Sequence, residues 1–188
     1  MELNNKTVLF LGSSVTYGSA AGGISFVDIL GERCGMKCIK DAVSGTTLVD
    51  IGERSYISRL KAIDTSIKLD LFVCQLSTND ATRKINIGEI EKAICFILDY
   101  ARENFACPIV FYTGTYFEST EYSKMIELLY ELRAKYDFYI LDLYQDSDML
   151  SISEEDYAKY MRDKIHPTLL GYQEWWTPKF IEFFKKLP

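Results

Sequence analysis

Two serines and a lone histidine are the residues of this chain whose types could carry out nucleophilic chemistry. Ser13 and Ser14 lie in the stretch VLFLGSSVTYGS, directly after an apolar run. His166 is the only histidine of the 188-residue sequence, and Asp163 precedes it by three positions in DKIHP. A serine becomes a good nucleophile when a base takes its proton, and imidazole does this near neutral pH. A carboxylate can orient that imidazole and stabilise its cation. The pattern therefore indicates acyl transfer by one of the two serines, with His166 and Asp163.

The loops between the two ends of the chain contain hydrogen-bond donors that such a reaction needs. A tetrahedral intermediate requires donors for its oxyanion. Suitable groups are the backbone N–H of Ser14, the backbone N–H of Gly45 in SGTT and the side-chain amide of Asn79 in QLSTND. We expect these three groups to form an oxyanion hole.

Each of these residues also has a purely structural interpretation. Ser13 or Ser14 alone is often a helix cap, and Asn79 and Asp80 are common loop and cap residues. A lone histidine before a proline is often structural or exposed. All the structural interpretations would have to hold independently, whereas one catalytic site explains the residues together. Phosphate-binding motifs are absent, since the sequence has neither a Walker-type loop nor G-x-G-x-x-G.

Short apolar runs alternate with longer helical patterns along the whole chain. The expected strands are 7–12, 36–43, 69–76, 108–114 and 138–144. The expected helices are 23–35, 47–63, 85–105, 120–136, 151–161 and 168–187. We expect Ser151 and Glu154 to form a capping box, and Pro178 to interrupt the last helix.

This alternation predicts an α/β fold in which helices cover both faces of a parallel sheet. No linker or repeat divides the sequence, so we expect residues 1–188 to form one domain. Ligand sites of such sheets lie at the carboxyl ends of the strands. If the first strand lies between the second and the third, the loops that carry Ser14, Gly45 and Asn79 meet at one edge.

Charge and cysteine content exclude several classes of protein. The net charge of −6 disfavours binding to nucleic acid or to an anionic membrane surface. The five cysteines include no C-x-x-C pair, and with one histidine a zinc site is improbable. We expect reduced, buried thiols in a cytoplasmic protein. No segment is apolar for long enough to span a bilayer, so we expect no membrane insertion.

Four short blocks of the sequence resemble those of the SGNH/GDSL hydrolases, in the same order. The family's G-D-S block resembles Gly12-Ser13-Ser14, and its glycine block resembles Gly45. Its G-x-N-D block resembles residues 77–80, and its D-x-x-H block resembles residues 163–166. The blocks extend from near the N-terminus to near the C-terminus, so the resemblance covers essentially the whole chain.

The resemblance implies a three-layer α/β/α sandwich with a flavodoxin-like, five-stranded parallel sheet. It implies Ser14 as nucleophile, His166 as general base and Asp163 as the group that orients it. It also implies an oxyanion hole made by Ser14, Gly45 and Asn79, with no metal or organic cofactor. Two residues depart from the family pattern, since Ser13 replaces an aspartate and Ser77 replaces a glycine. A side chain at Ser77 is expected to shift the Asn79 loop slightly.

A serine ester hydrolase is therefore the leading hypothesis, with a small-molecule ester as substrate. Tyrosines in the segments 115–123 and 145–162 and next to them favour a short acyl group, such as acetyl, on a carbohydrate or another small polar alcohol. These tyrosines are Tyr116, Tyr122, Tyr144, Tyr157 and Tyr160. A lysophospholipase, a thioesterase or an acyltransferase would use the same site. A non-catalytic flavodoxin-like module that binds a phosphate or nucleotide is an alternative of another class.

Overall fold

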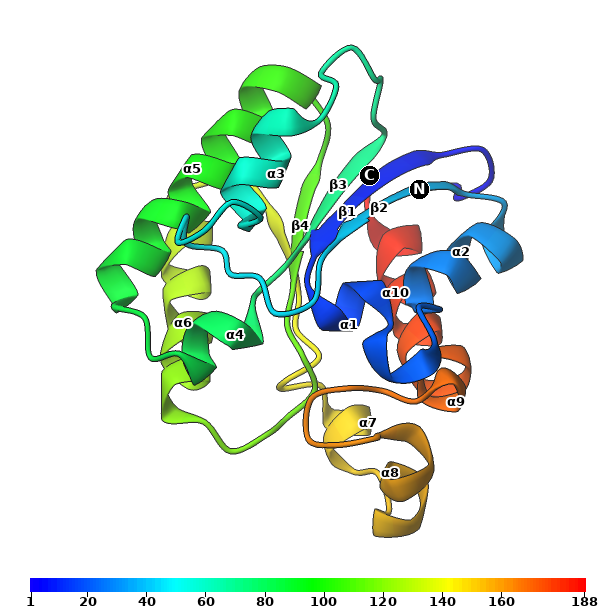
Figure 1. Ribbon diagram of the computed structural model, residues 1–188. Helices are drawn as coiled ribbons and strands as arrows, with labels where there is room; N and C mark the ends of the chain where they lie inside the picture. Colours follow the sequence, from blue (N-terminus) through cyan, green and yellow to red (C-terminus); the bar gives the residue numbers. More distant parts are fainter.

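Five parallel strands form one sheet in the computed structural model, which describes residues 1–188 (Figure 1). The strand order is β2-β1-β3-β4-β5, so the first strand lies between the second and the third as expected. The strands are β1 (Thr7–Gly12), β2 (Lys37–Ala42), β3 (Leu71–Gln75), β4 (Ile109–Tyr112) and β5 (Tyr139–Leu141). The order reverses at β1, which is where ligands bind in sheets of this kind.

Burial explains why the central strands are apolar and the edge strand is not. All residues of β3 and β4 are buried, because helices cover both faces of the sheet. Strand β2 lies at the edge and includes Lys37, Lys40 and Asp41, none of which is buried. Charged residues on an edge strand discourage pairing with another chain.

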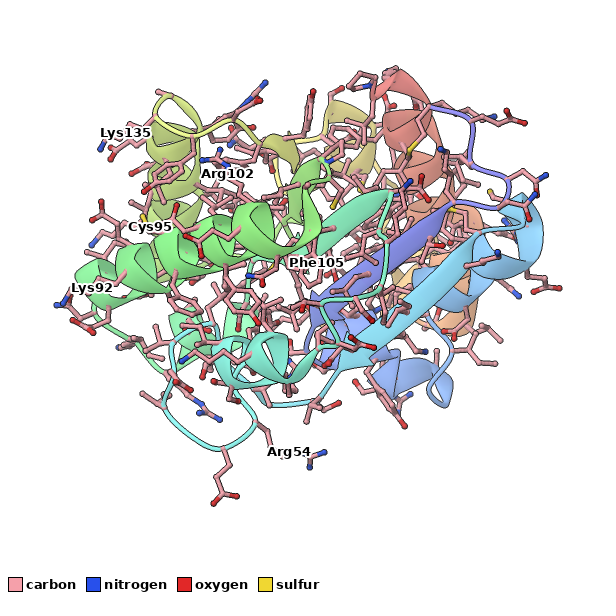
Figure 2. All side chains as sticks on the ribbon, turned by 90° about the horizontal axis from the view of Figure 1, so that it is seen from above. Arg54, Lys92, Cys95, Arg102, Phe105 and Lys135 are labelled. Atoms are coloured by element: carbon pink, nitrogen blue, oxygen red, sulfur yellow. The ribbon has the colours of Figure 1, made fainter.

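Helices cover the sheet on both faces, which confirms the predicted three-layer α/β/α sandwich (Figure 1). One face packs against α3 (Tyr56–Ala62), α5 (Ile87–Phe105) and α6 (Thr120–Arg133). The other packs against α2 (Phe26–Cys34), η2 (Tyr172–Trp176) and α10 (Thr177–Lys186). The view from above shows Phe105 beside the strands and Lys92 at the far end of α5 (Figure 2).

Shorter helices lie mainly at the carboxyl edge of the sheet. They are α1 (Ser14–Tyr17), η1 (Ser19–Ala21), α4 (Thr78–Thr82), α7 (Ser147–Leu150), α8 (Glu154–Tyr160) and α9 (Leu169–Gly171). Helices α1 and α4 follow β1 and β3 almost directly. Figure 1 shows α7 and α8 grouped beyond this edge of the sheet, near α9.

Aromatic side chains attach the end of the chain to the sheet. Trp176, Phe180 and Phe184 are fully buried. Phe26 stacks on Phe180 with a centroid distance of 4.0 Å, and its edge meets Tyr112 at 5.3 Å. Aromatic pairs of this kind stabilise a core beyond the area that they bury. The aromatic residues of the last helix therefore belong to the core.

The predicted helix 47–63 is wrong in its first half, because α3 begins only at Tyr56. The preceding segment is held open by the Asp80 carboxylate, which accepts hydrogen bonds from the N–H groups of Leu48 and Val49. Gly52 has a φ of 141°, which no helix allows. Ser55 then caps α3 by accepting from the N–H of Ser58.

Two details of the last third of the chain also differ from expectation. The cap of α8 is Ser153, whose hydroxyl accepts from the N–H of Asp156, so the predicted Ser151–Glu154 capping box is wrong. The expected interruption near Pro178 is a π-helical turn, η2, directly before α10. In this turn the N–H of Thr177 bonds to the carbonyl oxygen of Tyr172, five residues earlier, and Pro178 then lies in the first turn of α10, where a proline needs no N–H.

Candidate active site

The turn after β1 fixes the position of Ser14. A Cβ atom on Gly12 would lie 1.7 Å from Thr16 Oγ1 and 2.9 Å from Gln75 Oε1, so no larger residue fits there. Gln75 Oε1 accepts hydrogen bonds from the N–H of Ser13 at 2.9 Å and from Thr16 Oγ1 at 2.7 Å. Gln75 is the last residue of β3, so the neighbouring strand holds the turn in place.

The structure distinguishes the two adjacent serines. Ser13 is fully buried, and its hydroxyl lies 3.4 Å from Gln75 Oε1. Ser14 is 7% exposed, and its Oγ lies 2.8 Å from Nε2 of His166. Only Ser14 is both next to a base and within reach of a substrate.

His166 and Asp163 form a compact unit in the segment between α8 and α9. Nδ1 of His166 lies 2.9 Å from Oδ2 and 3.0 Å from Oδ1 of Asp163. The Asp163 carboxylate also accepts from the backbone N–H groups of Ile165 and His166, each at 2.8 Å. An isolated antiparallel bridge between Met161 and Pro167 closes this turn.

The surroundings of Asp163 favour its ionised form. Burial alone would raise its pKa, but the N–H of Ile165 and the N–H and ring of His166 outweigh burial and lower the pKa below its ordinary value of 3.8. An ionised carboxylate at Nδ1 selects the tautomer in which Nδ1 carries the proton, and this leaves Nε2 as an acceptor for the Ser14 hydroxyl.

The loops that carry Gly45 and Asn79 meet through one carbonyl group. Asn79 Nδ2 donates to the carbonyl oxygen of Thr46 at 2.9 Å. Gly45 has a φ of 79°, and a Cβ atom there would have no neighbour within 4 Å. A glycine is therefore favoured at this position by the positive φ and not by lack of space for a side chain. The amide of Asn79 keeps a second hydrogen for a ligand.

The Ser77 side chain takes part in the hydrogen bonds of the Asn79 loop. Its hydroxyl accepts from the N–H of Asn79 at 3.2 Å, so it caps α4. The same hydroxyl lies 3.4 Å from the carbonyl oxygen of Thr46. The side chain therefore connects the Asn79 loop to the Gly45 segment.

Arg59 is a residue that sequence reasoning missed. From helix α3 its guanidinium donates to the carbonyl oxygens of Gly12 and Asp41, each at 2.8 Å, and to Thr46 Oγ1 at 3.3 Å. It also pairs with the Asp41 carboxylate and lies over the ring of Tyr56. No motif marks this arginine in the sequence, because its partners come from three separate segments.

Asp80 supports the same region from within the protein. It is fully buried and accepts from the N–H groups of Leu48 at 2.9 Å and Val49 at 3.2 Å. Burial raises its pKa, although hydrogen bonds from Ser77 and the two N–H groups oppose the rise. Asp80 therefore shapes the segment after Gly45 and takes no direct part in the candidate site.

The cysteines offer no competing nucleophile. All five are free, and Cys74 alone is fully buried, so the expectation of buried thiols is only partly met. Burial raises the pKa of Cys38 to about 12 and that of Cys107 to about 11, so both thiols are protonated at neutral pH. No group of three or more His, Cys, Asp or Glu side chains could hold a metal ion.

The tyrosines that suggested a polar substrate have different roles. Tyr122 is buried, accepts from the N–H of Gly114 and donates to the carbonyl oxygen of Leu76, so it is structural. Tyr160 stacks on Trp175. The remaining three, Tyr116, Tyr144 and Tyr157, line hollows on the surface beyond β4 and β5.

Comparison with known proteins identifies the family of this chain. The model of the GDSL-like lipase/acylhydrolase family matches residues 10–174. No curated protein matches the sequence. The helices also show no span long and apolar enough to cross a membrane.

Solved structures with a similar fold come from several bacteria. A protein from Lactobacillus plantarum is 19% identical with a TM-score of 0.82, and the alignment covers 97% of this chain and 98% of that one. A member of the lipolytic protein G-D-S-L family from Veillonella parvula DSM 2008 is 15% identical with a TM-score of 0.76, covering 97% and 100%. A mutant of Axe2, an acetyl-xylooligosaccharide esterase from Geobacillus Stearmophilus, is 15% identical with a TM-score of 0.72, covering 97% and 95%.

Proposed function

Since the chain belongs to the GDSL-like lipase/acylhydrolase family and is a serine esterase, we propose that it removes a short acyl group from a carbohydrate or another small polar alcohol. The proposed nucleophile is Ser14, the general base is His166, and Asp163 orients that base. The reaction proceeds through an acyl-enzyme, and Ser14, Gly45 and Asn79 stabilise the oxyanion.

One observation carries this proposal. Ser14 Oγ lies 2.8 Å from His166 Nε2, while Nδ1 of the same ring lies 2.9 Å from Asp163. This is hydrogen-bond distance from nucleophile to base and from base to the group that orients it. The two residues joined by the first contact are separated by 152 positions in the sequence. A structural role for the histidine would not require its free nitrogen to face a serine.

The first half of the reaction follows from these contacts. Ser14 Oγ attacks the ester carbonyl carbon as its proton passes to His166 Nε2, and the carbonyl π electrons move to oxygen. The N–H groups of Ser14 and Gly45 and the Asn79 amide donate to that oxyanion. When the tetrahedral intermediate collapses, the C–O bond to the alcohol breaks. His166 Nε2 returns its proton to the leaving alcohol, and the acyl group stays on Ser14.

The second half repeats these steps with water. His166 Nε2 takes a proton from water, and the hydroxide oxygen bonds to the acyl carbon. The bond to Ser14 Oγ then breaks, and the proton on Nε2 returns to the serine. The carboxylic acid leaves. Asp163 remains ionised throughout, since its hydrogen bonds keep its pKa below the ordinary value.

A short acyl group on a polar alcohol agrees with the surroundings of the site. No long apolar helix covers the serine, and the segments near it are short helices and loops. The structurally similar Axe2 is an acetyl-xylooligosaccharide esterase, which is the class of substrate proposed here. Exposed aromatic side chains such as Tyr116 beyond the same sheet edge suit an amphipathic alcohol.

The proposal is tested by labelling the nucleophile. The purified protein is treated with a fluorophosphonate, which reacts with activated serines, and the adduct is located by peptide mass. We expect a single adduct on Ser14 that is lost in His166→Ala, followed by hydrolysis of small acetyl esters. A protein that is folded by circular dichroism but remains unlabelled would contradict the proposed triad. A label on Ser13 would contradict the choice between the two serines.

A further inference from the structure

Two adjoining hollows extend along the surface beyond β4 and β5. The inner hollow, of about 160 Å³, is lined by side chains that include Thr115, Tyr157 and Trp175. The outer hollow, of about 400 Å³, is lined by side chains that include Tyr130 and Tyr144. Tyr116 and Leu150 line both hollows, and each side chain is 52% exposed. The two hollows therefore adjoin, and we call them together the groove; Tyr116 and Leu150 mark the boundary between its inner and outer parts.

The inner hollow is lined by residues from two segments that adjoin the candidate active site. On one side, Thr115 follows Gly114, where an added Cβ atom would lie 3.9 Å from Thr78 Cγ2. Thr78 directly precedes Asn79. On the other side, Tyr157 lies in α8, and its carbonyl oxygen accepts from the N–H of Met161, the residue that opens the turn containing Asp163. Figure 1 shows α7 and α8, which carry part of the groove, beyond the carboxyl edge of the sheet near α9.

Thr115 provides a polar group that no part of the protein satisfies. The residue is 3% exposed, and its Oγ1 has no hydrogen-bond partner. A buried hydroxyl with no partner is unfavourable, because it has lost its hydrogen bonds to water. Because Thr115 lines the inner hollow, a ligand hydroxyl that reaches Oγ1 there would restore one.

The groove carries no positive charge. Neither hollow is lined by a lysine or an arginine, and the ionisable acid among the lining residues is Glu127. Asp142 lies close by, since it accepts from Tyr130 Oη and from the Gln145 side chain. The groove is therefore unsuited to phosphate, sulfate or carboxylate groups, which favour basic partners.

Contacts with Tyr144 fix the ring of Tyr116, which lies between the two hollows and can stack against a ligand. Its ring centroid lies 5.1 Å from that of Tyr144. Tyr144 Oη donates to the carbonyl oxygen of Phe117 at 2.7 Å, and so fixes the loop directly after Tyr116. A rigid aromatic ring gives a large contact area and loses little conformational entropy on binding.

We propose that this groove binds the alcohol part of the substrate, and that this alcohol is an uncharged oligosaccharide. This proposal rests on the proposed function above. The inner hollow takes the sugar ring that bears the acyl group, and Thr115 Oγ1 bonds to one of the hydroxyls of that sugar. Tyr116 packs against the apolar face of that sugar or the next, and the outer hollow takes the following sugar. The inner hollow is close in size to a cavity of about 150 Å³ that holds one benzene ring.

Binding and catalysis are measured separately to test this proposal. Xylo-oligosaccharide without acyl groups is titrated calorimetrically into Ser14→Ala, alone and combined with Tyr116→Ala, Tyr116→Phe or Thr115→Val. Hydrolysis of acetylated xylo-oligosaccharide and of para-nitrophenyl acetate is measured in the single groove variants with Ser14 intact. Tyr100→Ala is the matched control, because Tyr100 is also a partly exposed tyrosine that stacks on an aromatic ring, in this case Phe96, on distant helix α5.

We expect Tyr116→Ala to weaken saccharide binding at least tenfold and to raise KM for the acetylated oligosaccharide by a similar factor. Thr115→Val should weaken both several-fold. Tyr100→Ala should leave both unchanged, and Tyr116→Phe, which keeps the ring, should retain most of the saccharide binding. In the groove variants, kcat/KM for para-nitrophenyl acetate should fall less than kcat/KM for the acetylated oligosaccharide. An anionic oligogalacturonide should bind more weakly than the neutral saccharide.

Two results would overturn the groove proposal. One is hydrolysis of para-nitrophenyl acetate without any saccharide binding, which would leave the esterase function intact. The other is an equal loss of kcat/KM on both esters in Tyr116→Ala, which would make Tyr116 a structural residue. Conversely, Tyr116-dependent saccharide binding without hydrolysis of any ester would support the groove and count against the proposed triad.

Discussion

The guanidinium of Arg59 donates to the carbonyl oxygen of Gly12 at 2.8 Å and so connects helix α3 to the end of the strand that precedes the nucleophile. The same group reaches Thr46 Oγ1 at 3.3 Å, and the Thr46 carbonyl oxygen accepts from Asn79 Nδ2. A single side chain thus joins the nucleophile turn to both loops of the proposed oxyanion hole. An arginine can do this because its planar fork presents several donors at once.

Replacing Arg59 should reduce turnover more than binding. Arg59→Lys keeps the charge but cannot reach Gly12, Asp41 and Thr46 together, so we expect kcat to fall roughly 10-fold to 100-fold, as small displacements of catalytic groups do. Steady-state kinetics would show this with KM almost unchanged. Arg102→Lys is the matched control, because Arg102 also lies over a tyrosine ring and donates to a backbone carbonyl, far from the site. Equal effects of the two substitutions would rule out a positioning role for Arg59.

Removing the Asn79 amide should impair catalysis and leave the protein folded. Asn79→Ala deletes one proposed oxyanion donor, a change that typically costs about 10²–10³ in kcat. The substitution also deletes the bond to the Thr46 carbonyl oxygen. Thermal unfolding should therefore be checked beside the kinetics, and we expect a loss of stability of about 1 kcal/mol. Turnover close to that of the wild type would exclude Asn79 from the oxyanion hole.

Acidification should inactivate the folded enzyme. His166 must be neutral to act as base, because only an unprotonated Nε2 can accept the proton of Ser14. The pKa of Asp163 is lowered below 3.8, so its stabilising contribution is complete above that pH and is lost as pH falls through the folded value. The rate should therefore decline with falling pH while Asp163 is still ionised and circular dichroism stays constant. A rate that stays flat from neutral pH down to the range in which Asp163 titrates would contradict the assignment of His166.

The role of the carboxylate can be tested independently of this titration. Asp163→Asn keeps the shape of the side chain but removes its charge, and it no longer selects the tautomer with the proton on Nδ1. We expect kcat to fall on the order of 10³–10⁴-fold. Fluorophosphonate labelling of Ser14 should slow in parallel. Asp156→Asn, in the nearby helix α8, provides a control at a carboxylate whose partners are instead the Ser153 hydroxyl and Lys159.

Adding one methyl group at Gly12 should destabilise the protein strongly. The new Cβ would overlap Thr16 Oγ1 at 1.7 Å and press on Gln75, so the turn would have to move. Overpacking of this kind costs about 1–3 kcal/mol or more. Gly31→Ala is the control, because its Cβ would meet nothing closer than 3.4 Å in the interior of α2. Chemical denaturation of both variants would show whether Gly12→Ala is the less stable.

The sequence predicted the strands well because buried parallel strands are continuous apolar runs. Residues 69–76 and 108–114 have this pattern, and both contain the expected strands. The loops that carry Ser14, Gly45 and Asn79 could be placed at one edge of the sheet, because loops that follow parallel strands meet there. The order of the first three strands then follows as expected.

What the sequence did not predict depends on contacts between distant segments. The irregular stretch before α3 depends on Asp80, about thirty residues later, which binds the N–H groups of Leu48 and Val49. Local helical spacing cannot reveal such a partner, since tertiary contacts override propensity. The bonds made by Arg59 and the shared carbonyl of Thr46 are non-local in the same way. Ser153 rather than Ser151 caps α8, which is within the usual uncertainty of helix ends.

The separation of Ser14 and His166 in the sequence has a consequence for how the enzyme is made. Ribosomes add about 5–20 residues per second, so Ser14 is synthesised on the order of ten seconds before the proposed base, His166. In the proposed mechanism, the serine of the nascent chain has no base to activate it during that interval. Reactivity would then arise only when the segment between α8 and α9 reaches the turn after β1. The appearance of hydrolytic activity would report that these two parts of the chain have come together.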